Sequence, residues 1–128
     1  MATIELTKDN FNETLTENDF VLIDFWASWC GPCKQFAPVF EKASEDNPDL
    51  VFAKVDTEDQ QELAASFEIQ SIPTLMVVRD RTVIYSQPGA LPEEALQDLI
   101  KQARELDMDE VQREIAKQQA DGDPATEE

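Results

Sequence analysis

The two cysteines of the chain, Cys30 and Cys33, lie in one C-x-x-C element, and this spacing gives the clearest indication of chemistry in the sequence. Two thiols so close in the chain can close into a disulfide and open again, so the pair predicts thiol–disulfide exchange. The element follows an apolar strand pattern and opens a predicted helix. Unpaired backbone N–H groups and the positive end of the helix dipole favour a thiolate at that position. We therefore expect Cys30 to be the nucleophile and Cys33, one turn further on, to be the resolving thiol.

Other uses of two cysteines fit the sequence less well. A zinc site takes about four nitrogen or sulfur ligands, and a chain with 2 Cys and no His falls short unless two chains meet. A purely structural bridge over so short a loop constrains the unfolded chain little, and a reducing compartment would open it. Two inert buried thiols would leave Gly31, Pro32 and the preceding Trp29 unexplained. Redox exchange is the preferred interpretation, with no metal or cofactor expected.

Composition narrows the class of protein further. The formal net charge of -18 argues against nucleic acid and anionic membrane surfaces as partners. The acids either steer basic partners toward the chain or keep its surface solvated. Because His is absent, Ser/His/Asp and Cys/His catalysis are excluded. No apolar run approaches the roughly 18 residues of a membrane span, and the first residues do not resemble a signal peptide, so we expect a cytoplasmic protein.

The elements that must position the cysteines follow from the spacing of apolar residues. Residues 20–26 are almost continuously apolar, which indicates a central strand covered on both faces. A helix runs from the cysteines to about Asp46. Further strands are expected at 3–6, 50–55, 73–78 and 82–85, the last two forming a hairpin, and further helices from a Thr7 cap to about Leu15, at 60–67 and at 92–105. A chain of 128 residues organised in this way predicts one α/β domain.

An extension follows this domain, which we place at residues 1–106. Asp107 and Glu110 are spaced as a capping box, so an extra helix is predicted over 107–120. Its apolar stripe is thin and consists of Met108, Val111 and Ile115. Residues 121–128 are acidic, have little to bury and are expected to be disordered.

Two charged residues stand where the pattern predicts buried strands. Asp24 interrupts the most apolar strand, and Lys54 interrupts the next one. An ionised carboxylate buried there would be costly unless it were paired or neutralised, and neutralisation raises its pKa. A buried acid of that kind close to Cys33 could accept the proton of its thiol, with Lys54 modulating the charge. The alternative is a satisfied buried ion pair without a catalytic role.

The segment from Phe25 to Lys34, FWASWCGPCK, closely resembles the active-site signature of thioredoxins. The segment SIPT at 71–74 and the pair Pro88 and Gly89 resemble two further landmarks of that family, in the right order. The resemblance covers residues 3–104. The chain differs from the family at two places. Asp80 and Arg81 stand in the turn between the last two strands, where thioredoxins usually have a Gly, and Ser71 stands where they often have a Gly.

The resemblance implies the thioredoxin fold, a mixed central β-sheet flanked by α-helices, with Pro73 in the cis form facing the cysteines. It places Asp24 and Lys54 behind the active site. The substrate-binding groove is expected to include Trp29, Gly31, Pro32, Ile72, Pro73 and Gly89.

In function, the resemblance implies a reductase of disulfide-containing proteins that is itself recycled by an NADPH-dependent thioredoxin reductase and acts as a monomer. The sequence leaves one rival open, a binding module or co-chaperone whose acidic C-terminal extension recognises clients.

Overall fold

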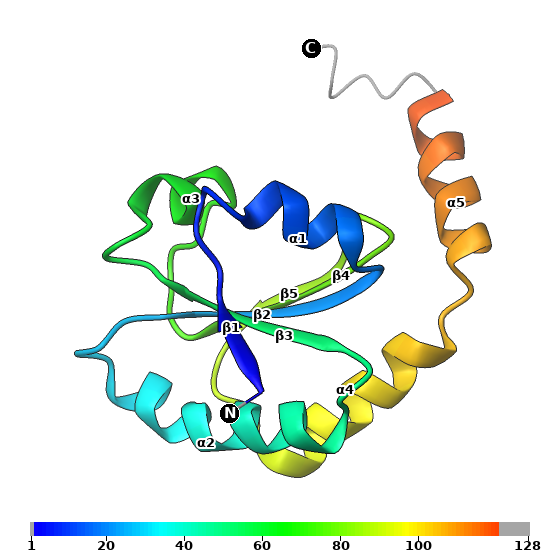
Figure 1. Ribbon diagram of the computed structural model, residues 1–128. Coiled ribbons are helices and arrows are strands. Elements are labelled where there is room, and N and C mark those ends of the chain that lie inside the picture. The colour runs from blue at the N-terminus through cyan, green and yellow to red at the C-terminus, as the bar shows by residue number, and fades with distance from the viewer. Residues whose placement is uncertain (1, 121–128) are drawn as a thin grey trace.

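The computed structural model describes residues 2–120, which form a five-stranded sheet with helices on both faces (Figure 1). The strands are β1 (Thr3–Glu5), β2 (Phe20–Trp26), β3 (Val51–Asp56), β4 (Thr74–Arg79) and β5 (Thr82–Pro88). They lie in the order β1-β3-β2-β4-β5, with β3 parallel to both of its neighbours and β4 antiparallel to both of its own. The sheet is therefore mixed, as predicted.

The helices divide between the two faces of the sheet. They are α1 (Phe11–Glu17), α2 (Gly31–Asp46), α3 (Gln61–Ser66), α4 (Glu93–Glu105) and α5 (Met108–Ala120). In Figure 1, α1 and α3 lie on one face, and α2 and α4 lie on the other. Each pair of helices closes its own apolar cluster against the sheet.

The central strand β2 contributes to both clusters because successive side chains of a strand point to opposite faces. Leu22 packs under α2 and α4, whereas Val21 and Ile23 pack under α1 and α3. Since both faces are covered, the strand needs apolar residues at nearly every position, which confirms the reading of its sequence. Asp24 shares the face of Leu22 and therefore points toward the α2 side.

The predicted start of α1 was wrong. Thr7 does not cap the helix, which begins at Phe11 after Asn10 and continues to Glu17. The hydroxyl of Thr7 instead accepts a hydrogen bond from the N–H of Asp9, at 3.2 Å. The side-chain oxygen of Asn10 accepts one from the N–H of Thr7, at 2.7 Å. These short-range bonds close a separate turn ahead of the helix.

The hairpin between β4 and β5 forms without the glycine usual in the family. Arg79 pairs with Thr82, so the loop consists of Asp80 and Arg81. Both have positive φ, 52° and 63°, as a two-residue turn of this kind requires. Strand β5 also extends to Pro88, three residues beyond the predicted Tyr85, because its end pairs with Thr74.

The extra helix α5 is present and begins where its capping signal predicts. The carboxylate of Asp107 accepts a hydrogen bond from the N–H of Glu110, at 3.2 Å. Met108 is buried, and the side chain of Gln112 donates to the hydroxyl of Thr82, at 2.8 Å. Thr82 lies at the hairpin end of the sheet, so α5 attaches there. The disorder expected for 121–128 concerns residues outside the described part of the chain.

Candidate active site

The two cysteines are joined by a disulfide at the start of α2. Cys30 is the N-cap of this helix, and its Sγ accepts a hydrogen bond from the backbone N–H of Cys33, at 3.1 Å. This N–H is one of the donors that a helix start leaves without a backbone partner. Exposure does not distinguish the two residues, because Cys30 is 4% exposed and Cys33 is 3% exposed. The hydrogen bond does distinguish them, since it points at the sulfur of Cys30.

The loop before β4 lies directly beside this disulfide. The peptide bond between Ile72 and Pro73 is cis, as the resemblance implied. The carbonyl oxygen of Ile72 lies 3.7 Å from the Sγ of Cys30. The carbonyl of Pro73 accepts a hydrogen bond from the N–H of Gly89, at 2.8 Å. Gly89 has φ of 119°, which side chains rarely tolerate, so a glycine is needed for the chain to turn here.

The rim of the site is exposed around Cys30. Gly31 and Pro32 are exposed, and the indole of Trp29 is 65% exposed. The indole N–H of Trp29 donates a hydrogen bond to a carboxylate oxygen of Glu58, in the loop after β3. Sequence reasoning missed Glu58. The available signal was the acid-rich segment DTED at 56–59, which follows β3 at the same end of the sheet where the cysteines follow β2.

Asp24 and Lys54 lie on neighbouring strands, where they pair in the register of β2 and β3. Asp24 has no exposed surface, and within residues 2–120 neither of its carboxylate oxygens has a hydrogen-bond partner. Burial raises the pKa of Asp24 from its ordinary value of 3.8 to about 7, against a smaller lowering effect of the Lys54 charge. The two residues therefore do not form a satisfied ion pair.

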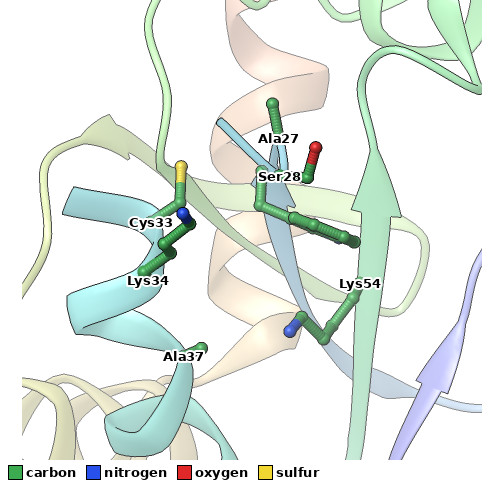
Figure 2. A pocket seen from close by; sticks show the side chains of 7 residues that line it. Ala27, Ser28, Cys33, Lys34, Ala37 and Lys54 are labelled. Carbon is green, nitrogen blue, oxygen red and sulfur yellow. The ribbon is translucent and has the colours of Figure 1, made fainter. Parts of the chain in front are cut away.

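A hollow of about 270 Å³ opens between α2 and the strands at this point. Its walls include Cys33 and Lys54 together with Trp26, Ala27, Ser28, Lys34 and Ala37. Figure 2 shows Cys33, Lys34 and Ala37 along α2, with Lys54 facing them from its strand. Cys33 and Lys54 thus border one space large enough for water.

Neither a metal-binding cluster nor a membrane-spanning helix is found among residues 2–120. Residues 2–120 contain no cluster of three or more His, Cys, Asp or Glu side chains that could hold a metal ion. None of the helices within this range is both long enough and apolar enough to cross a membrane.

Comparisons with known proteins agree with this site. The thioredoxin family model matches residues 2–102. A protein named putative thioredoxin 2 from Streptomyces coelicolor is 68% identical over 119 residues, which cover 93% of this chain and 89% of that protein. A thioredoxin of Bacillus subtilis is 43% identical over 101 residues, covering 78% of this chain and 96% of the relative. A solved thioredoxin from Plasmodium falciparum has a TM-score of 0.72 at 34% identity, covering 78% of this chain and 97% of that one.

These similarities and the cysteine pair at the helix start agree on one class of protein, a dithiol:disulfide oxidoreductase that acts on the disulfides of other proteins. Within that class, the chain belongs to the thioredoxin family. The segment aligned with the Streptomyces protein has 119 residues, which is longer than residues 1–106. The similarity to that relative therefore includes part of the extension.

Proposed function

We propose that Cys30 attacks the substrate disulfide and that Cys33 resolves the mixed disulfide. The thiolate of Cys30 displaces one substrate sulfur, which leaves as a thiol, and Cys33 then displaces the other. Two electrons pass to the substrate, and the Cys30–Cys33 disulfide remains. The observation that carries this assignment is the hydrogen bond from the N–H of Cys33 to the Sγ of Cys30, at 3.1 Å. The same donor would stabilise negative charge on that sulfur once it is reduced.

Asp24 is the base for the second step. An acid with a pKa near 7 can accept a proton at neutral pH and release it again, which an ordinary Asp does poorly. Asp24 takes the proton of the Cys33 thiol directly or through a water as Cys33 attacks. The charge of Lys54 favours the carboxylate, which is the form of Asp24 that accepts the proton. Cys33 shares a hollow with Lys54, the register partner of Asp24, and this supports a water-mediated route for the proton.

The substrate lies in the groove around Cys30. An extended substrate segment forms backbone hydrogen bonds with the loop at Ile72, whose carbonyl already lies beside the reactive sulfur. Trp29, Gly31 and Pro32 form one side of the groove, and Pro73 and Gly89 form the other. The exposure of Trp29 supports this placement, because a large exposed indole offers contact area to a bound protein.

The remaining assignments concern the recycling of the protein, its oligomeric state, its location in the cell and its domain boundaries. An NADPH-dependent thioredoxin reductase returns the disulfide to the dithiol, and the chain acts as a monomer in the cytoplasm. Residues 1–106 form the catalytic domain, and 107–120 are an added helix. Membership of the family supports recycling by this reductase. The Gly-Pro pair between the cysteines resembles that of the reducing members of the family, which supports a reducing compartment.

The rival function, client recognition by the extension, gains no support from the position of α5. This helix contacts Thr82 at the hairpin end of the sheet, whereas Ile72 and the disulfide lie near the opposite end of β4. A client held by α5 would have to reach across the length of the sheet to meet the cysteines.

Trapping experiments test the assignment of the two thiols. With a protein disulfide as substrate, Cys33→Ser should accumulate a mixed disulfide because its attacking thiol remains, and Cys30→Ser should form none. Mass spectrometry of each variant after the reaction measures this. The unsubstituted chain, assayed with NADPH and a thioredoxin reductase, is the control for turnover. Trapping by Cys30→Ser instead would reverse the assignment.

A further inference from the structure

Trp26, Asp24 and Lys54 share one face of the sheet, the face toward α2. Asp24 and Trp26 are two residues apart on β2, so their side chains point the same way. Lys54 is the register partner of Asp24 on β3. Directly opposite residues on neighbouring strands lie close enough for their side chains to interact. Lys54 is therefore placed to approach either the carboxylate or the ring.

The lysine amine lies over the ring. The Nζ of Lys54 is 5.0 Å from the centroid of the Trp26 ring, within the range of a cation–π contact. Among residues 2–120, the four salt bridges found involve other cations, and the oxygens of Asp24 have no hydrogen-bond partner. Two acids lie near enough to compete for Lys54. Glu5 is its partner on β1, and Asp56 pairs with Trp26, but both lie toward the surface.

We propose that Trp26 is a positioning residue that holds the ammonium of Lys54 over its ring and so keeps it from pairing directly with Asp24. The carboxylate then feels the lysine charge only at a distance. This inference rests on the proposed role of Asp24 as the base.

The position of the amine matters because a direct ion pair would stabilise the carboxylate. An opposite charge in contact lowers the pKa of an acid, and a carboxylate with a low pKa is a weak base toward a thiol proton. With the amine on the ring, burial dominates over the Lys54 charge at Asp24. The same ring and amine line the hollow that reaches Cys33, so the arrangement lies beside the atoms that react.

A double-mutant cycle separates this role from simple burial, because removing a large ring also admits water. The measurement is the pKa of Asp24 in the oxidised protein, from the carboxyl carbon shift in NMR. We expect Trp26→Leu to lower this pKa by about one unit, the value of a partly buried cation–π contact. In the Lys54→Met background the same substitution should have little effect. Trp26→Phe retains a weaker ring and should give a smaller shift that also requires Lys54.

The control variants distinguish the proposal from two alternatives, an effect of burial alone and an effect of Glu5. An equal shift with and without Lys54 would attribute the effect to burial and overturn the proposal, as would no shift in either Trp26 variant. Glu5→Gln removes the acid on the other side of Lys54, and a shift as large as that of Trp26→Leu would show that Glu5 holds the amine. The titration needs no substrate, and insulin reduction by the unsubstituted chain is measured separately. A chain that failed to reduce insulin would contradict the proposed function without deciding the role of Trp26.

Discussion

Replacing Asp24 with Asn should stabilise the oxidised protein, and the stabilisation should grow as the pH rises. In the unfolded chain Asp24 loses its proton near the ordinary 3.8, whereas in the folded protein it does so near 7. Between these values the folded state keeps a proton that the unfolded state has released. Stability therefore falls as the pH rises through this interval. Below it the acid is neutral in both states and the ionisation penalty disappears.

The size of the effect follows from the two pKa values. A rise from 3.8 to about 7, at ~1.36 kcal/mol for each pKa unit, makes the full penalty about 4 kcal/mol above pH 7. Asn has a similar shape and does not ionise, so the variant escapes this penalty. Its advantage over the unsubstituted protein should increase by about 2.5 kcal/mol between pH 5 and pH 8.

Urea denaturation of both oxidised proteins at several pH values measures this difference. Asp19→Asn is the matched control, because it removes an exposed carboxylate from the residue just before the same strand. Its free energy of unfolding should stay within about 0.5 kcal/mol of the unsubstituted protein at each pH. If the advantage of Asp24→Asn were the same at pH 5 and pH 8, the raised pKa of Asp24 would be refuted.

Two further predictions concern activity. The rate at which Cys33 resolves a mixed disulfide should increase with pH through an inflection near pH 7, because only ionised Asp24 can take the proton. The Asp24→Asn variant should lack this inflection. Stopped-flow kinetics would exclude Asp24 as the base if the variant kept the inflection. Deletion of 107–128 should leave insulin reduction within a few-fold and lower the free energy of unfolding by about 1.5 to 3 kcal/mol, the value of burying a side chain such as Met108. Loss of activity with the fold intact would instead favour client recognition by the extension.

The fold could be predicted from the sequence where a pattern of residues was compatible with only one arrangement of the chain. The apolar run of β2 could be accommodated only between two layers, and the cysteine pair at the start of α2 determined where the chemistry lies. The start of α1 was not predictable from the cap preference of Thr7. Asn10, three residues later, has the same preference, and the bonds that it and Thr7 make within the turn decide between them.

The sequence identified candidate residues for the site, but it did not identify Glu58 or several of the contacts between these residues. The unusual positions of Asp24 and Lys54 in apolar strands identified both. Their relation did not follow, because the sequence could not show that the lysine amine lies over Trp26. The bond between Trp29 and Glu58 joins residues far apart in the chain on exposed loops, where no periodicity connects them. Such contacts depend on the path of the folded backbone.

The attachment of α5 at the hairpin has a practical consequence for handling the protein. Arg79 fixes the approach to this helix, because its guanidinium donates to the carbonyl oxygens of Ala103, at 2.8 Å, and Leu106, at 3.2 Å. An affinity tag, dye or solid support joined to the chain after α5 would be connected through the end of the sheet remote from the disulfide. A sensor chip or resin prepared in this way would leave the disulfide end of the sheet facing the solution.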